Sequence, residues 1–415
     1  MKKASRKTAV SLALLALTGG AFAQSSVTLF GIVDVGVSYY SLKSNNVGAV
    51  TAARPSSITL SQTALTSGNW VPSRWGFRGT EDLGGGMSAG FWIEQSLNVD
   101  DGTQPLYSRR STVSLTGSLG EIRLGRDLSP TFWADTVTDP FLNSGVGANL
   151  IGMVNARIAV FTALPGGGLL AGPAGGPANY IFVNNAINYF TPNTLGGFFG
   201  QLSMNFSENP KVSNDTNTPS KRGQYYAGRI GWANDKLDIA ASYAESYALD
   251  ASPPYATPLT DTKVSTANLT STYDLGFMKL YGELSRATND SRYALPGAAS
   301  ASKATYDGAM IGLTVPVGPM RIRSSYGYVK YNNDNVTVPV ANQEASISKF
   351  SLGLTYNLSK RTLLYATGAW TNIKDGQNHP TVLGVPPQTS GAYTTATGYA
   401  PKSATGYDFG VAHTF

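Results

Sequence analysis

One stretch near the start of the chain decides the fold, and it reads Val27-Thr28-Leu29-Phe30-Gly31-Ile32-Val33-Asp34-Val35-Gly36-Val37-Ser38. The valine and leucine side chains at 27, 29, 33, 35 and 37 fall on one face of an extended strand, and the polar or small residues at 28, 34, 36 and 38 fall on the other. One face is suited to lipid and the other to water. This alternation is typical of a tilted strand in a membrane-spanning β-barrel.

The same alternation recurs along the chain and predicts sixteen strands. They cover 27–40, 70–80, 87–98, 107–118, 120–129, 180–191, 197–207, 222–233, 236–247, 263–274, 277–288, 304–316, 319–331, 346–357, 361–373 and 402–415. An even number of antiparallel strands closes a barrel without free edges, so every backbone polar group has a partner in lipid. We therefore expect an all-β fold, a sixteen-stranded antiparallel transmembrane β-barrel, as a single domain over residues 24–415.

The connections between these strands alternate in length. Tight turns lie at 83–86, 119–120, 195–197, 234–235, 275–276, 317–319 and 358–360, and long polar segments lie at 208–221, 248–262, 289–303, 332–345 and 374–401. Outer-membrane barrels have short turns on the periplasmic side and long loops outside. The pattern predicts a multi-pass barrel in the outer membrane with both termini in the periplasm.

The first 23 residues have the pattern of an export signal. Four basic residues precede an apolar run over 8–17, and Ala21-Phe22-Ala23 predicts cleavage between Ala23 and Gln24. Because this leader holds four of the 31 basic residues and none of the 25 acidic ones, the mature chain keeps 27 basic against 25 acidic residues. A nearly neutral mature chain argues against nucleic acid as a partner. The absence of cysteine excludes disulfides and thiolate metal sites.

Charged residues that are in phase with the polar set are expected to point into the lumen. Trp75 and Phe77 fall on the lipid face, so Arg74 and Arg78 fall on the inner face. Neighbouring strands add further arginines, and the predicted basic wall of the pore is Arg74, Arg78, Arg109, Arg110, Arg123 and Arg126. Other residues predicted to face the lumen are Asp34, Glu94, Asp127, Arg229, Arg321 and Arg323. Any one of these taken alone is better explained as a solvated strand residue, and their clustering is what favours a role in the pore.

The longest connection, about 130–178, has apolar side chains that need a surface to pack against. In a wide barrel that surface is the lumen, so we expect this segment to fold inward as a constriction loop. It carries Asp135 and Asp139, which would then face the arginines across the pore. The alternatives are a surface loop or a flexible Gly/Ala stretch.

Several motifs resemble one known family. Ser73-Arg74-Trp75-Gly76-Phe77-Arg78-Gly79-Thr80-Glu81-Asp82-Leu83-Gly84-Gly85-Gly86 closely resembles the second hairpin of the trimeric general porins of betaproteobacterial type, which are Gram-negative outer-membrane porins. Residues 26–31, 120–126, 185–189 and 410–415 match the same family. The resemblance implies a homotrimer of sixteen-stranded barrels, each narrowed by its third loop, with basic wall residues facing acidic loop residues.

The resemblance also assigns individual residues. Arg74 matches the wall arginine of the family, and the family's arginine on the fourth strand aligns with Arg109. Alternation with Val113 and Leu115 points Arg110 inward instead, so both arginines remain candidates. Where the family often has an arginine shortly before the Asn-Asn of strand six, this chain has Ile181-Phe182-Val183-Asn184-Asn185, which weakens the expectation of a strong preference for anions.

The last strand places Tyr407, Phe409, Val411 and Phe415 on one face and ends on an aromatic residue. This ending resembles the signal by which the barrel-assembly machinery recognises outer-membrane proteins, so Phe415 is the predicted assembly signal. An aromatic residue at the membrane interface would have the same pattern. The expected partners are two further copies of the chain, outer-membrane lipid and lipopolysaccharide, the assembly machinery, ions and small hydrophilic solutes.

The predicted function is passive diffusion of ions and small hydrophilic solutes through a water-filled pore, with a small preference for anions. An enzyme would need a catalytic constellation, and the two histidines, His379 and His413, lie in different parts of the barrel pattern. The sequence predicts neither a cofactor nor a metal site. A channel specific for one class of solute is the alternative, but Tyr225 and Tyr281 do not form the row of aromatic residues that a sugar channel would need.

Overall fold

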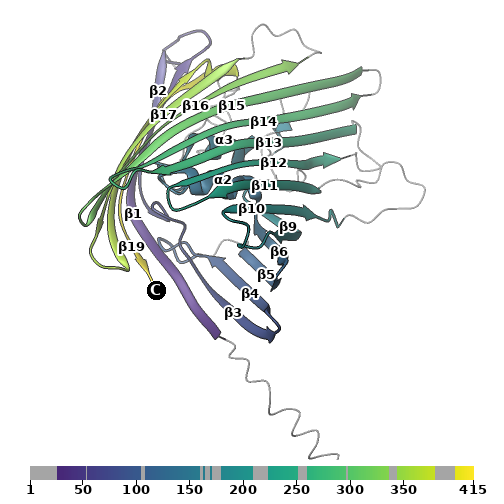
Figure 1. Ribbon diagram of the computed structural model, residues 1–415. Helices are drawn as coiled ribbons and strands as arrows, with labels where there is room; N and C mark the ends of the chain where they lie inside the picture. The colour runs from purple at the N-terminus through teal and green to yellow at the C-terminus, as the bar shows by residue number, and fades with distance from the viewer. Residues whose placement is uncertain are drawn as a thin grey trace, which may run out of the picture.

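A single antiparallel sheet curls round until its first and last strands pair, which closes a barrel (Figure 1). In this computed structural model β1 (Ser26–Asn46) pairs with β19 (Tyr399–Thr414), with Ile32 opposite Thr414 and Tyr39 opposite Tyr407. The structure describes residues 26–52, 54–103, 108–158, 162–163, 169–170, 179–208, 223–250, 259–295, 298–335, 344–378 and 398–415. The predicted cleavage point at Ala23 and Gln24, most of 159–178, and His379 lie outside these residues.

The remaining barrel strands follow one another round the barrel in the order of the chain. The strands are β2 (Ser57–Ser67), β3 (Arg74–Gly84), β4 (Met87–Ser96), β5 (Ser108–Gly117), β6 (Gly120–Leu128), β9 (Phe182–Phe190), β10 (Phe198–Asn205), β11 (Tyr225–Ala233), β12 (Leu237–Asp250), β13 (Leu259–Asp274), β14 (Lys279–Leu295), β15 (Ala298–Val317), β16 (Met320–Asn335), β17 (Ala345–Asn357) and β18 (Thr362–Lys374). The two-residue strands β7 (Thr162–Ala163) and β8 (Leu169–Leu170) pair with each other and are not part of the barrel sheet. A short 3₁₀ turn, η1 (Gly376–Asn378), follows β18.

Two of these strands share one position in the barrel. The upper part of β1 pairs with β2, from Val35 opposite Ser67 to Asn45 opposite Ser57, and its lower part pairs with β3, from Ser26 opposite Thr80. The seventeen strands of the sheet therefore occupy sixteen positions, so the prediction of a sixteen-stranded antiparallel barrel is confirmed. The predicted strand 70–80 corresponds to β3, and β2 was not predicted because Ser57–Ser67 has polar residues on both faces.

Several segments that were predicted to be loops are partly strand. β12 ends at Asp250 and β13 begins at Leu259, β14 and β15 leave only residues 296–297 between them, and β16 continues to Asn335. Beyond the hydrocarbon layer both faces of a strand meet water, so the hydrogen-bonded ladder continues while the alternation disappears. The period-two test therefore ended these strands too early.

The outer face carries the apolar side chains that the alternation predicted. Ile230 and Ile311 are 69% and 68% exposed, and Leu202 and Val113 are 63% and 61% exposed. Large apolar side chains with this exposure on successive strands are suited to lipid rather than to water. Among the described residues, no helix is both long enough and apolar enough to cross a membrane.

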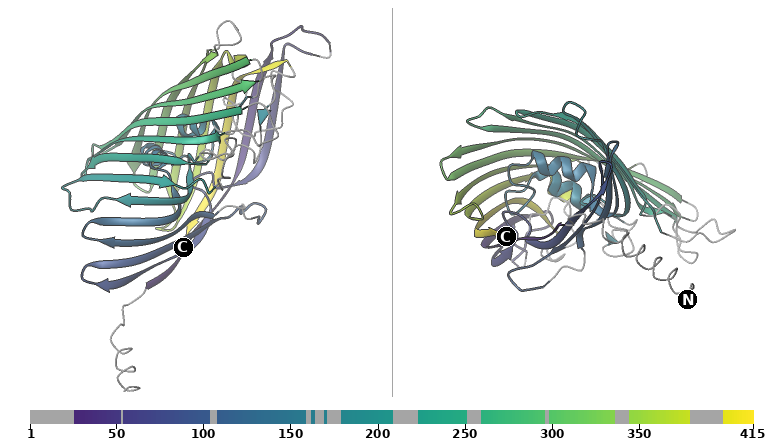
Figure 2. Two further views of the ribbon diagram at one scale, coloured as in Figure 1. Left: turned by 90° about the vertical axis from the view of Figure 1, so that its right-hand side faces the viewer. Right: turned by 60° about the horizontal axis from the view of Figure 1, so that its bottom comes forward.

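The connection between β6 and β9 contains two helices, α2 (Pro130–Thr138) and α3 (Leu150–Ile158), which lie inside the curve of the sheet (Figure 2). Ser129 caps α2, because its Oγ accepts a hydrogen bond of 3.1 Å from the backbone N–H of Phe132. α2 packs against β11, β12 and β13, and α3 packs against β14, β15 and β16. Helices of nine residues were not predicted, because their apolar pattern is too short to be told from that of a loop.

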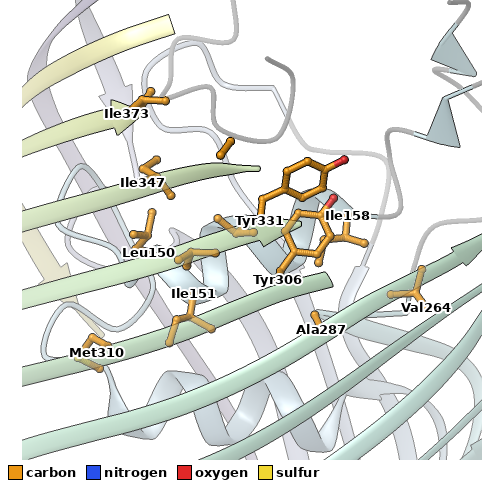
Figure 3. Packing of buried hydrophobic residues seen from close by; sticks show 13 residues of the cluster. Leu150, Ile151, Ile158, Val264, Ala287, Tyr306, Met310, Tyr331, Ile347 and Ile373 are labelled. Atoms are coloured by element: carbon orange, nitrogen blue, oxygen red, sulfur yellow. The ribbon is translucent and has the colours of Figure 1, made fainter. Parts of the chain in front are cut away.

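A hydrophobic core joins α3 to the inner face of the barrel (Figure 3). Leu150, Ile151, Val154 and Ile158 pack against inner-face residues of β13 to β18, which are Val264, Ala287, Tyr306, Met310, Val329, Tyr331, Ala345, Ile347 and Ile373. Burial of each valine, leucine, isoleucine or methionine side chain among them contributes about 1.5–3 kcal/mol. The inner face is therefore apolar where α3 packs against it, although the alternation predicted a polar one.

Candidate pore site

Arginines from four strands meet at a pocket on the other side of the inner wall. Arg74 of β3, Arg109 and Arg110 of β5, Arg123 of β6 and Arg229 of β11 line a space of about 460 Å³. Trp133 of α2 lines the same space, so helix and wall lie on either side of it. We call this space the wall pocket.

Two carboxylates hold the arginines of the wall pocket in place. Glu94 Oε1 lies 2.5 Å from Arg109 Nε and 3.5 Å from Arg74 Nε. Asp127 Oδ2 lies 2.6 Å from Arg123 Nη1, and its Oδ1 lies 3.7 Å from Arg110 Nε. Both acids are on the predicted inner face but are buried, at 7% and 4% exposure, so they act as ion-pair centres between arginines rather than as charges in open water.

A β-bulge explains why alignment and alternation favoured different arginines on β5. Glu94 pairs with Arg110 but the next residue, Gln95, pairs with Ser108, so Arg109 is the extra residue. A bulge re-aims the side chains around it. Both Arg109 and Arg110 consequently line the wall pocket.

Aromatic rings lie behind the same arginines. The guanidinium of Arg110 lies 4.5 Å from the ring centroid of Trp92, and that of Arg123 lies 4.2 Å from that of Phe190. Cation–π contacts of this kind hold a guanidinium without neutralising its charge. Trp92 and Phe190 were not predicted as pore residues, although both rings are in phase with the inward-facing set of their strands.

The other predicted wall arginines lie elsewhere. Arg126 donates a hydrogen bond to Asn184 and stacks on Phe182 at 4.8 Å, and it does not line the wall pocket. The ladder between β6 and β9 shifts register between Gly125 and Asp127, which breaks the alternation at this point. Arg78 lies nearer the turn between β3 and β4 and lines a second pocket.

The prediction that Asp135 and Asp139 face the arginines is wrong. Both are buried, at 0% and 1% exposure. Asp135 accepts hydrogen bonds from Tyr180 Oη and Asn268 Nδ2, and Asp139 accepts three from backbone N–H groups between residues 141 and 149. These carboxylates are used to hold the loop in place. Burial raises the pKa of Asp135 to about 6, against the lowering effect of its hydrogen bonds, and also raises the pKa of Asp139.

The segment 139–149 is fastened to the wall by three charged residues, of which Arg323 was predicted to face the lumen. Arg323 Nη1 donates to the carbonyl oxygen of Pro140 at 3.3 Å, and Lys349 Nζ donates to that of Ala148 at 2.5 Å. Asp408 accepts from the backbone N–H of Val146 at 2.7 Å. Arg323 is therefore covered by the loop, whereas Arg321 on the same face of β16 is exposed.

Three further predicted residues are placed as follows. Asp34 is fully buried, because it accepts hydrogen bonds from Tyr365 and from the backbone N–H groups of Trp70 and Val71 at the corner between β2 and β3. Phe415 is 42% exposed and exchanges two backbone hydrogen bonds with Gly31, at 3.0 and 3.1 Å. Tyr225 is 1% exposed, so it cannot contact a passing solute.

The chain is similar to known proteins over nearly its whole length. The family model described as Gram-negative porin matches residues 9–376. Outer membrane porin protein 32 of Delftia acidovorans is 34% identical over 99% of this chain and 100% of its own length. An outer membrane porin protein of Bordetella pertussis is 29% identical over 88% of this chain and 94% of its own length.

A solved structure with a similar sequence has the same fold. The structure titled anion-selective porin from Comamonas acidovorans is 31% identical, has a TM-score of 0.66, and covers 94% of this chain and 100% of its own. The motifs of the second hairpin and the closed sixteen-position barrel agree with these matches. The chain therefore belongs to the Gram-negative porin family, and it is an outer-membrane channel for passive diffusion rather than an enzyme.

Proposed function

We propose that the channel prefers small anions, and that the segment from α2 to α3 forms the constriction past which they move. The observation that carries this proposal is the charge of the wall pocket, which is lined by five arginines and two carboxylates. The two loop carboxylates that would have balanced the arginines, Asp135 and Asp139, are buried instead. A passing ion therefore meets an excess of positive charge.

The surroundings strengthen the effect of this charge. Low-dielectric walls around a narrow aqueous space focus the electric field and raise the local concentration of the counter-ion. Because rings and carboxylates hold the guanidinium groups of Arg110 and Arg123, their charge stays beside the path of the ion. The absence of an arginine at 181–185 removes one family charge, but Arg229 on β11 adds another to the pocket.

The position of Trp133 supports a narrow point at this level. It is 42% exposed and lines the wall pocket opposite strands β3 to β6. The same pocket thus combines a ring from the loop with the charges of the wall. The porin of Comamonas acidovorans is described as anion-selective, which supports the same sign of preference for this chain.

The preference is tested by the reversal potential of single channels in a KCl gradient. We expect the sign of an anion-selective pore in the full chain, and a smaller value in Arg74→Ala and in Arg110→Ala. Arg286→Ala is the matched control, because Arg286 is exposed on the outer face and pairs with Asp307 at 2.6 Å. A reversal potential of cation-selective sign in the unmodified protein would overturn the proposal.

We also propose that three copies of the chain assemble, as the resemblance implies, and that lipopolysaccharide and the assembly machinery are partners. The exposed apolar side chains of the outer face are available for contact with lipid or with a second barrel. Native electrophoresis with chemical cross-linking should give products of three chain masses. If all products were monomeric under detergent conditions that keep the barrel folded, the trimer would be contradicted.

A further inference from the structure

A second pocket lies below the wall pocket, at the end of the barrel with the short turns. Its volume is about 400 Å³, and β1, β3, β4, β5 and β6 line it. The two pockets share Trp92 and Arg110, which line both of them. An anion that leaves the wall pocket toward the periplasm would therefore enter this lower pocket next.

One indole ring organises the basic groups of the lower pocket. Arg78 of β3 is opposite Trp92 of β4 in the ladder, and its guanidinium lies 5.1 Å from the Trp92 ring centroid and 5.4 Å from that of Phe30. Arg110 reaches the same indole from β5, at 4.5 Å. Trp92 Nε1 donates to Glu94 Oε2 at 3.1 Å, which fixes the ring. Trp92 thus holds two guanidinium groups that come from the strands on either side.

The positive charge in this pocket is poorly compensated. Across the part of the chain that the structure describes, Arg78 makes ring contacts but no ion pair. One carboxylate, that of Glu121, is among the lining residues, and it already pairs with Arg123. Arg123 Nε donates to Glu121 Oε1 at 3.0 Å, and Arg123 Nη2 donates to Glu121 Oε2 at 2.9 Å. Because ring contacts use the face of a guanidinium and not its edge, they leave the N–H groups of Arg78 available for an oxyanion in the pocket.

Hydroxyl groups surround these arginines. Those that line the pocket come from four strands and are Ser26, Thr28, Thr80, Ser88, Ser114 and Thr116. A guanidinium edge binds two oxygens of one oxyanion through parallel hydrogen bonds. A tetrahedral oxyanion has further oxygens that can accept hydrogen bonds from hydroxyls at the same time, whereas a carboxylate has only two oxygens.

We propose that the lower pocket is a binding site for phosphate-type oxyanions, held by the edge of Arg78 and the surrounding hydroxyls, with Trp92 as the residue that positions Arg78 and Arg110. This site rests on the proposed preference for anions, because phosphate reaches it through the wall pocket. The expected ligands are inorganic phosphate and small phosphate esters. The site would slow these solutes as they cross and would raise their local concentration at the periplasmic end.

The test uses single channels of the full protein in KCl at constant ionic strength, to which potassium phosphate at pH 7 is added in steps. We expect the chloride current to fall and to saturate, and acetate at the same concentrations to have a much smaller effect. Arg78→Ala should raise the half-saturating phosphate concentration at least about tenfold, because the two parallel hydrogen bonds from the charged guanidinium edge are lost. Arg286→Ala should leave it unchanged.

A second variant separates the hydrogen-bonding geometry of the Arg78 guanidinium, its fork of N–H donors, from its positive charge. Arg78→Lys keeps the positive charge but loses the fork and the stacking on Trp92, so it should keep the reversal potential in KCl and still weaken the phosphate effect. The change of electrophoretic mobility on heating confirms that each variant forms a barrel. The site is overturned if the current is insensitive to phosphate, if acetate acts equally, or if Arg78→Ala and Arg78→Lys leave the phosphate effect unchanged.

These results are distinct from a failure of the proposed function. An anion-selective reversal potential without a saturable phosphate effect would leave the preference for anions in place and remove the lower site. A cation-selective reversal potential would overturn both proposals.

Discussion

Glu94 is the carboxylate whose removal most directly tests the role of the charged wall. It lies between Arg109 and Arg74, at 2.5 and 3.5 Å from their Nε atoms, and reduces the charge that both present to the pore. Replacement by glutamine keeps the size of the side chain and keeps an acceptor for Trp92 Nε1. The change Glu94→Gln should therefore strengthen the preference for anions, although it disrupts an ion-pair network.

The size of the effect follows from Coulomb's law. One unit charge acts on an ion about 7 Å away in water with about 0.6 kcal/mol, and screening at 0.1 M salt reduces this by about half. The effect has opposite signs for chloride and potassium, so their difference is again about 0.6 kcal/mol. The permeability ratio of chloride to potassium should rise about threefold, since about 1.4 kcal/mol corresponds to a factor of ten.

The assay is the reversal potential in a KCl gradient, measured on Glu94→Gln and on Arg74→Ala side by side. The first variant should raise the chloride-to-potassium ratio, and the second should lower it by a similar factor. Asp307→Asn is the control, because it removes an equal charge from an exposed ion pair on the outer surface. If Glu94→Gln lowered the ratio or left it at the wild-type value, the arginines would not be setting the selectivity.

Three further predictions concern the loop, the core and the last residue. Burial raises the pKa of Asp135 to about 6, so the folded state binds this proton more tightly than the unfolded state does. The stability that this group contributes is therefore present at low pH and is lost as pH rises through about 4 to 6. Asp135→Asn should remove up to about 3 kcal/mol of this pH dependence, measured by the heat-induced mobility shift at pH 4 and pH 7. Ile151→Ala, at a side chain with 1% exposure, should destabilise the barrel by about 2–5 kcal/mol and lower the temperature of the same mobility shift, and the exposed Leu142→Ala should change it little. Deletion of Phe415 should lower the amount of protein inserted in the outer membrane while the leader is still cleaved, and normal insertion would contradict its role as an assembly signal.

The sequence predicted the barrel well, because its strands follow a period of two. Trp75 and Phe77 on the lipid face are enough to turn Arg74 inward, and the same counting turns Glu94 and Arg229 inward. The alternation of short turns with long connections likewise predicts that the strands follow one another round the barrel in chain order. These features depend on local geometry that each strand carries by itself.

The parts that could not be predicted depend on contacts between distant residues. The bulge at Arg109 exists only in the ladder between β4 and β5, and alternation counts through it as if it were regular. The burial of Asp135 depends on Asn268, which is 133 residues away along the chain. A carboxylate in a loop is equally suited to water and to buried hydrogen-bond donors, so its sequence neighbours do not decide between them.

The two sides of the inner wall differ, and this difference matters for redesign. The apolar side, from β13 to β18, holds α3 through its hydrophobic core, whereas the arginine side, from β3 to β6, faces the wall pocket. Folding energy and ion selectivity are thus supplied by different strands. An engineer who wishes to build a sensing nanopore from this scaffold can exchange the charges on one set of strands and leave untouched the residues that keep the barrel folded.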